Sequence, residues 1–255
     1  MRVSSESVLV ETRFLAAPVG SRNSSEIGPV NRYSPFRDPR ISFSKAQEKD
    51  LSTFVLHPLE EAAVGEAVSP KRRMDFMLGR MAARGALVGL GHGEVGPVLR
   101  GEHREPLWPQ GTVGSISHSG GFGVAAVARQ EDFSGLGIDI QQVEDRYSDE
   151  LVARFADPDE FDWVRSIPSL RTERAVKLFS AKESVFKALY PVARVWFAFD
   201  AAKLTPREGE LGFAATVRLP AVSSGVIHLD VDVAIVDGFV ITGAVLVKPL
   251  PVVAV

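Results

Sequence analysis

The segment Phe179-Ser180-Ala181-Lys182-Glu183-Ser184-Val185-Phe186-Lys187-Ala188-Leu189-Tyr190-Pro191 is the most informative part of this chain. Side chains three and four residues apart share one face of a helix, so Glu183 lies between Phe179 and Phe186, with Lys187 one turn on. A carboxylate in an apolar stripe needs a metal, a cation or a ligand as partner, because burial without one is costly. The alternative is an ordinary Glu-to-Lys helix pair worth about 0.3–0.5 kcal/mol. The segment alone leaves both interpretations open.

The composition of the 255-residue chain excludes several classes of protein. Its apolar content of 45% can build one large domain or two small ones. A net charge of −3 argues against a nucleic-acid-binding protein, which needs a basic surface. The absence of cysteine excludes disulfides and thiolate chemistry. No apolar run reaches the ~20 residues that span a bilayer, and the N-terminus does not resemble a signal peptide, so we expect a cytoplasmic protein that binds no membrane.

A second long helix is predicted from Ser69 to Gly91, because apolar residues recur there at helical spacing and Gly91 provides a stop. Its polar side is strongly basic and carries Lys71, Arg72, Arg73, Arg80 and Arg84. Such a face is either solvated or an anion-binding site, and the sequence does not decide between them. Residues 20–45 show no sustained periodicity, so we expect residues 1–48 to form a partly irregular N-terminal extension.

The remaining pattern predicts an α+β protein. Strands are expected at 112–118, 122–128, 135–141, 211–219, 226–235 and 239–247, and helices near 149–155, from Asp157-Pro158 and from Ser169 to Tyr190. Asp157 and Ser169 are suitable N-caps, and Asp237-Gly238 is a strong hairpin signal. Helices and strands come in blocks, which favours α+β over an alternating parallel fold. Helix-plus-sheet units occur on both sides of about residue 134, without a close sequence repeat.

Polar residues in two strand segments could carry chemistry. In Gly137-Ile138-Asp139-Ile140-Gln141 the strand period turns Asp139 and Gln141 to one side, where two oxygens could bind a hard cation such as Mg²⁺. The alternative is a solvated strand end. In Gly114-Ser115-Ile116-Ser117-His118-Ser119-Gly120-Gly121, Ser117 and His118 could donate to a phosphate, although a histidine at a strand end often has only a structural role.

The alternating residues His228, Asp230 and Asp232 resemble a set of metal ligands. Their apolar neighbours explain the pattern more simply as an amphipathic strand with one buried face. We therefore predict no metal site there.

Three segments in order resemble the signature motifs of the 4′-phosphopantetheinyl transferases: GSISHSGG (114–121), GIDIQ (137–141) and FSAKESVFKALYP (179–191). Two more, KRRMDFMLGRMAARGAL (71–87) and REPLWPQG (104–111), resemble the enterobactin-synthetase-associated branch of the Sfp type. The resemblance covers roughly residues 50–200. It implies a monomer with two similar α+β lobes related by a pseudo-twofold axis, which we place at 49–133 and 134–255.

The resemblance also implies an activity, namely transfer of the 4′-phosphopantetheine arm of coenzyme A to a serine of an apo carrier protein, with Mg²⁺ or, in its place, Mn²⁺. Asp139, Gln141 and Glu183 match the metal-binding positions of the family. Glu183, Lys187 and Asp139 match its catalytic positions, with Glu183 as the acid that deprotonates the serine and Lys187 at the pyrophosphate. Coenzyme A contacts are expected from Arg73, Arg80, Arg104, Ser117, His118, Lys182 and Lys187.

One position departs from the family pattern, because Gln141 stands where the family usually has Glu. An amide oxygen can still coordinate Mg²⁺ but supplies no charge, so weaker metal binding is expected. A non-catalytic relative that binds coenzyme A or a carrier protein is the alternative function, and a metal-dependent pyrophosphate hydrolase is a third. The sequence does not identify the carrier protein.

Overall fold

The structure, a computed structural model, describes residues 31–65, 68–144, 146–219 and 225–247. Residues Arg32–Val255 group into one compact unit, to which everything below refers. Most of the expected N-terminal extension lies outside the described residues. In the described part of the chain, no helix is long and apolar enough to cross a membrane.

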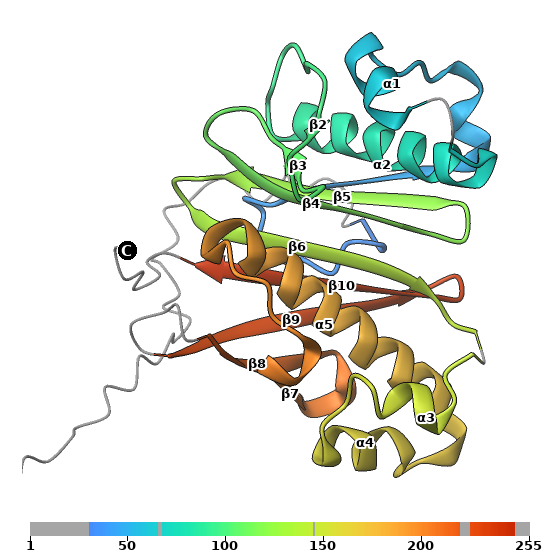
Figure 1. Cartoon of the computed structure of the whole chain (residues 1–255), viewed down its shortest axis with the longest axis vertical. Coiled ribbons are helices and arrows are strands. Elements are labelled where there is room, and N and C mark those ends of the chain that lie inside the picture. The colour runs from blue at the N-terminus through green and yellow to red at the C-terminus, as the bar shows by residue number, and fades with distance from the viewer. Residues whose placement is uncertain (1–30, 66–67, 145, 220–224, 248–255) are drawn as a thin grey trace, which may run out of the picture. The chain divides into compact units, whose positions relative to one another are not determined.

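The helices and strands follow one another in blocks, as expected for an α+β protein (Figure 1). The helices are α1 (Pro58–Val64), α2 (Pro70–Gly89), α3 (Asp149–Val152), α4 (Pro158–Arg165) and α5 (Arg171–Ala193). The strands are β1 (Ser42–Gln47), β2 (Leu99–Arg100), β3 (Pro106–Leu107), β4 (Thr112–Ser119), β5 (Phe122–Arg129), β6 (Phe133–Gln142), β7 (Ala202–Pro206), β8 (Gly212–Arg218), β9 (Val226–Val236) and β10 (Phe239–Val247).

Helix α2 packs on a three-stranded antiparallel sheet of order β1-β5-β4. The helix begins with Pro70 at its first position, and the Ser69 side chain accepts a bond from the Arg72 N–H. Its buried face includes Leu78, Ala82 and Leu87, which join the apolar residues of β5 in one core. Of the basic residues of α2, Lys71 and Arg72 are exposed, whereas Arg80 is buried.

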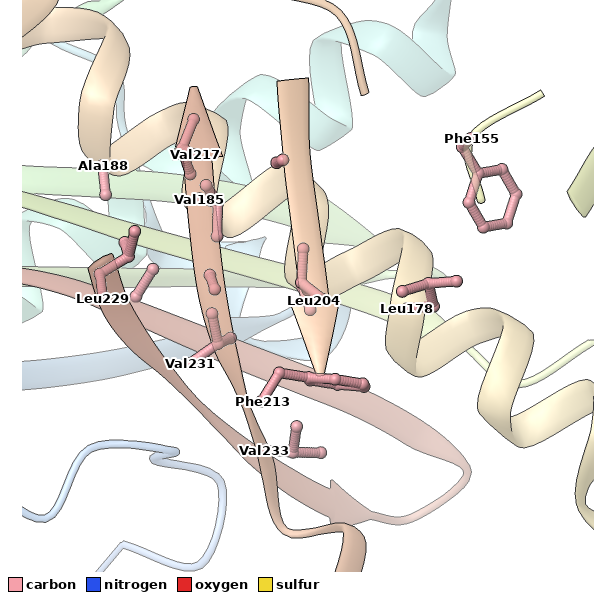
Figure 2. Packing of buried hydrophobic residues seen from close by; sticks show 14 of the residues in the cluster. Phe155, Leu178, Val185, Ala188, Leu204, Phe213, Val217, Leu229, Val231 and Val233 are labelled. Atoms are coloured by element: carbon pink, nitrogen blue, oxygen red, sulfur yellow. The ribbon is translucent and has the colours of Figure 1, made fainter. Parts of the chain in front are cut away.

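Helix α5 packs on a five-stranded antiparallel sheet of order β6-β10-β9-β8-β7. Figure 2 shows Leu178 and Val185 of the helix in the same core as Phe213, Val217 and Val231 of the sheet. Strand β6 lies beside β4, and the Gln142 N–H donates to the Ser119 hydroxyl at 3.3 Å. The two helix-on-sheet arrangements therefore meet along β4 and β6.

Glycines let both long helices lie directly on a strand. A Cβ at Gly137 of β6 would lie 1.9 Å from the Ser184 carbonyl oxygen, and one at Gly123 of β5 would lie 2.5 Å from that of Leu78. Any larger residue would push helix and strand apart. The glycines of GIDIQ and SGGFG therefore set how closely the functional elements approach.

The predicted α+β class is confirmed, with differences in detail. Residues 42–47 form β1 and pair with β5, so part of the segment expected to be irregular is a sheet edge. Helix α5 begins at Arg171 and not after Ser169, because Pro168 starts a separate 3₁₀ turn. It continues past Pro191, since a proline near a helix end interrupts only one hydrogen bond.

The turn between β9 and β10 agrees with the sequence prediction. Asp237 and Gly238 both have positive φ, 51° and 77°, as a two-residue hairpin turn requires. Helix α1 and strand β7 were not predicted. Both are short, and tertiary contacts rather than a repeating pattern stabilise such segments.

Candidate active site

Glu183 and Asp139 are brought together by the close contact of α5 with β6. Gly137 places the helix backbone against the strand two residues before Asp139, and Ser184, which it contacts, follows Glu183 directly. Alternation along β6 then turns Asp139 out of the sheet on the same side as the helix. The sequence predicted both acids separately, and the fold places them in one cluster.

Asp139 is the centre of this cluster and is almost fully buried, with 2% of its surface exposed. One carboxylate oxygen accepts hydrogen bonds from the Ser117 hydroxyl and the Lys187 ammonium, both at 2.7 Å. The other accepts from the Gln141 amide at 3.0 Å. A buried carboxylate with three donors, one of them charged, is a satisfied and rigid group.

Gln141 connects this cluster to the surface. Its amide nitrogen donates to Asp139, and its amide oxygen accepts from the Arg146 guanidinium at 3.0 Å. The oxygen that was predicted as a metal ligand therefore has a cation as its partner in this arrangement.

Glu183 is half-buried at the edge of a pocket. Burial raises the pKa of its carboxyl group, an effect that the nearby Asp139 charge reinforces and the Lys187 charge opposes. A carboxylate with a raised pKa next to a cavity has the properties of a general base.

The pocket has a volume of about 780 Å³, and most of the charged side chains that line it are cations. Its charged lining consists of the cations Lys71, Arg72, Arg80, Arg100, Arg104 and Lys187 and the acids Asp75 and Glu183. Helix α2, the β2–β3 segment, β4 and α5 all contribute. Such a concentration of positive charge in a concave site is suited to a polyanionic ligand.

Arg80 is the most deeply buried cation of this lining, with 5% of its surface exposed. Its guanidinium carbon lies 4.2 Å from the centre of the Phe76 ring. Burial lowers the pKa of Arg80 to about 10, while the charge of Glu60 opposes this change. Within the described residues, Arg80 Nε is the only buried side-chain nitrogen or oxygen without a hydrogen-bond partner. Arg80 therefore brings a buried positive charge to the pocket lining, and that charge would attract an anionic ligand.

Arg100 and Arg104 also line the pocket. Arg100 lies 4.5 Å from the Phe76 ring centre, and its pKa is lowered by burial and then by the charges of Arg104 and Arg72. Arg104 has a positive φ of 71°, which is uncommon for a residue with a side chain. Sequence reasoning missed Arg100 because it lies on a two-residue strand outside the quoted motifs.

His118, an expected coenzyme A contact, also lines the pocket, and its Nδ1 lies 3.7 Å from an Asp75 carboxylate oxygen. Burial lowers the pKa of the imidazole, and the Lys187 and Arg100 charges act in the same direction, while Asp75 and Asp139 oppose it. The ring is therefore neutral at pH 7 in this arrangement.

Three residues that were predicted as coenzyme A contacts do not line the pocket, namely Arg73, Ser117 and Lys182. Arg73 forms a bidentate ion pair with Glu61 of α1, and the neighbouring Arg72 lines the pocket instead. Ser117 is buried against Asp139 and Lys187. Ser117 therefore supports the acid cluster.

Lys182 lies in the core of the α5 sheet, away from the pocket. Its ammonium contacts Glu160 and the carbonyl oxygens of Phe199 and Ala202, at 2.8, 3.1 and 2.8 Å. The expected contact of Lys182 with coenzyme A is not supported, because three oxygens already surround its charge.

The predicted metal ligands supply suitable donors for a hard cation. Asp139 and Glu183 offer carboxylate oxygens and Gln141 offers an amide oxygen, the donor types that Mg²⁺ prefers. In the described part of the chain, no three residues among His, Cys, Asp and Glu are grouped to hold a metal. The predicted set contains two acids, and its third member is an amide.

An α+β fold with a cationic pocket next to a buried acid–lysine cluster is suited to an enzyme that acts on a polyanionic substrate. Comparison with known protein families identifies the kind of enzyme more closely. The model of the 4′-phosphopantetheinyl transferase N-terminal domain matches residues 59–128, and that of the 4′-phosphopantetheinyl transferase superfamily matches residues 135–241. The chain is 39% identical over 193 residues to 4′-phosphopantetheinyl transferase Svp of Streptomyces mobaraensis, covering 74% of this chain and 76% of that protein.

This chain therefore belongs to the 4′-phosphopantetheinyl transferase family and is an enzyme of that family. It is also 37% identical over 150 residues to 4′-phosphopantetheinyl transferase Npt of Nocardia iowensis, covering 58% of this chain and 65% of that protein. Enterobactin synthase component D of Salmonella typhi is 38% identical over 138 residues, covering 53% and 55%. The resemblance inferred from the motifs is thus confirmed.

Proposed function

We propose that this enzyme transfers the 4′-phosphopantetheine moiety of coenzyme A to a serine of an apo acyl, peptidyl or aryl carrier protein and releases 3′,5′-ADP. The observation that carries this proposal is the cationic pocket that opens onto Glu183 and Lys187. Coenzyme A has a pyrophosphate and a separate 3′-phosphate, so it needs several cations spread over one concave surface.

The α2 side of the pocket would bind the nucleotide end of coenzyme A. Arg80, Arg100 and Arg104 hold their charges there, and His118 adds a donor. The same charges would stabilise the leaving 3′,5′-ADP, whose charge increases as the bond to phosphorus breaks.

The α5 side would carry out the transfer. Glu183 accepts the proton of the carrier serine, whose oxygen forms a bond to the phosphorus that bears the pantetheine arm. The bond from this phosphorus to the oxygen shared with 3′,5′-ADP breaks, and the ADP keeps that electron pair. Lys187, oriented by Asp139 and Ser117, places positive charge beside the pyrophosphate.

Asp139, Glu183 and Gln141 would hold Mg²⁺, which neutralises charge on the pyrophosphate when it is bound. The burial of Asp139 and its contact with Gln141 keep two of these ligands together. The missing charge at Gln141 suggests weaker metal affinity than in a site with three acids.

Two further expectations stay proposals. The helix-on-sheet arrangement on each side of the β4–β6 contact supports lobes at 49–133 and 134–255, and such a fused pair would function as a monomer. The carrier protein is the expected partner, and neither the pocket nor the motifs identify its pathway.

The test is incubation of the protein with coenzyme A, Mg²⁺ and an apo carrier protein, followed by mass spectrometry of the carrier. We expect the carrier to gain the mass of phosphopantetheine and 3′,5′-ADP to accumulate in equal amount. Coenzyme A breakdown without carrier modification would indicate a hydrolase. An unchanged carrier with bound coenzyme A would indicate a binding protein and contradict the proposal.

A further inference from the structure

Two buried glutamates occupy equivalent places in the two helix-on-sheet arrangements. Glu60 is the third residue of α1 and Glu160 is the third residue of α4, and each helix has proline at its first position. Each glutamate accepts a hydrogen bond from the N–H of its own N-cap residue, His57 at 3.0 Å and Asp157 at 2.7 Å. Glu60 is 0% exposed and Glu160 is 2% exposed. The local sequences His57-Pro58-Leu59-Glu60 and Asp157-Pro158-Asp159-Glu160 share little beyond this pattern.

The remaining contacts of the two carboxylates also correspond. The second oxygen of Glu60 accepts from the Val98 N–H at 3.0 Å, and that of Glu160 accepts from the Leu204 N–H at 2.7 Å. A cation from the long helix completes each group: Arg84 of α2 for Glu60, and Lys182 of α5 for Glu160. Each carboxylate therefore ties a short helix, a strand segment and a long helix together.

The two groups differ in what lies next to them. The Glu160 group is closed, because the Lys182 ammonium has two backbone carbonyls as its other partners. The Glu60 group has a second cation, Arg80, whose Nε lies 4.0 Å from a carboxylate oxygen and whose side chain lines the pocket. That distance is too long for a hydrogen bond but short enough for strong attraction in a buried setting.

We propose that Glu60 is a positioning residue for the nucleotide side of the pocket, because it compensates the buried charge of Arg80 without binding its nitrogens. Arg84, Val98 and His57 already occupy the carboxylate of Glu60, so the Arg80 guanidinium lies beside this charge without a hydrogen bond to it and still lines the pocket. This inference rests on the proposed function, since it assigns the Arg80 ligand as the nucleotide part of coenzyme A. Glu160 provides an internal comparison with the same local contacts and no contact with the pocket.

The test compares Glu60→Gln with Glu160→Gln in the full chain. Binding of 3′,5′-ADP is measured by calorimetry, kcat and KM for coenzyme A are measured with an apo carrier, and Tm is measured for each variant. Both variants lose a buried charge partner, so both should have a lower Tm. Only Glu60→Gln should weaken 3′,5′-ADP binding and raise the KM for coenzyme A, each about tenfold, with kcat within about twofold of the wild type.

A second variant covers the case in which Glu60→Gln does not fold. Arg84→Met removes the main partner of Glu60 without touching the pocket, so Glu60 can pair directly with Arg80 and withdraw it. We expect this variant to weaken 3′,5′-ADP binding as well. Wild-type affinity of Glu60→Gln for 3′,5′-ADP would overturn the positioning role. If Glu60→Gln does not fold, wild-type affinity of Arg84→Met would overturn it. Equal losses of 3′,5′-ADP affinity in Glu60→Gln and Glu160→Gln would also overturn it. Failure of the wild type to bind 3′,5′-ADP would instead overturn the proposed function and this inference with it.

Discussion

The helices α2 and α5 pack on their sheets in the same way and contribute different chemistry. Each lies on an antiparallel sheet, and a glycine without a side chain lets the helix backbone approach the strand closely, Gly123 under α2 and Gly137 under α5. Helix α2 presents arginines to the pocket, whereas α5 presents Glu183 and Lys187. The comparison teaches that one architecture can place cations on one side of a pocket and an acid–lysine pair on the other, and that the pocket lining depends on both.

The largest effect is expected on the α5 side. Glu183→Gln should lower kcat by about 10²–10⁴-fold, because an amide cannot accept the serine proton. Steady-state transfer to an apo carrier measures this loss, and an unchanged Tm shows that the fold is intact. Glu173→Gln is the matched control, since Glu173 lies on the same helix and pairs with Lys177 outside the pocket. Near-normal turnover in Glu183→Gln would show that Glu183 on α5 is not the general base.

The glycine contact itself can be broken. Gly137→Ala should lower the free energy of unfolding by about 2–4 kcal/mol, because the new methyl group would lie 1.9 Å from the Ser184 carbonyl oxygen. Chemical denaturation measures this change. Gly93→Ala is the control, since no atom lies within 4 Å of a Cβ added there. Equal stability of both variants would contradict the close contact of α5 with β6.

The binding role of the α2 side can be tested with two arginines. Arg100→Gln should raise the Kd for coenzyme A about 10–100-fold, because Arg100 lines the pocket and a charged hydrogen bond contributes about 1.5–3 kcal/mol. Arg73→Gln should change it less than about threefold, since Arg73 pairs with Glu61 on the surface. A larger increase of this Kd in Arg73→Gln than in Arg100→Gln would support the coenzyme A contact that the family resemblance implies for Arg73, and it would contradict the arrangement in this structure.

The metal affinity of the α5 side should respond to Gln141. Gln141→Glu should lower the Mg²⁺ concentration for half-maximal rate by about threefold to tenfold, since a third carboxylate adds charge to the site. Arg146, which contacts the Gln141 side chain, would compensate part of the repulsion between the new carboxylate and Asp139. A metal titration at constant coenzyme A measures this change, and an unchanged midpoint would exclude Gln141 from the metal site.

The smallest effect is expected from pH on the α2 side. Burial lowers the pKa of His118, so the free enzyme holds a neutral ring at pH 7, and we expect a bound phosphate to favour the protonated ring. Affinity for 3′,5′-ADP should therefore increase as pH falls, by about threefold to tenfold between about pH 7.5 and about pH 5.5. His118→Gln keeps the titration of the ligand itself and should show a smaller change. Identical pH profiles would show that His118 does not bind the phosphate in its charged form.

Much of the fold followed from local patterns. The helical spacing of apolar residues predicted α2, and the Asp237-Gly238 pair predicted the β9–β10 hairpin. The short elements were missed, because β1 pairs with a strand about 80 residues further along the chain, Ser42 opposite Val127, and carries no turn signal of its own. Such elements depend on contacts that periodicity does not report.

The candidate site was predictable only in part. Glu183 was found because an acid interrupts an apolar helix stripe, and Asp139 because the strand period turns it to the polar side with Gln141. Lys187 follows Glu183 by one helix turn, and its role came from the family resemblance. The structure brings all three together. Arg73 and Lys182 belong to the same motifs but face other partners. A motif gives the order of residues along a helix, and only packing determines which of them face the cavity.

The amino-acid order alone predicts an α+β fold from the sequence of helices and strands, and it predicts the two acids from the spacing within their segments. The transferase family followed from the resemblance of several motifs in order to those of known proteins. Tertiary structure decided that Arg72 and Arg100 line the pocket while Arg73 does not, and that Glu60 lies beside Arg80. The physical reason is distance in the chain. Glu60 and Arg80 are 20 residues apart and meet only where α1, α2 and the segment at Val98 converge on one buried carboxylate.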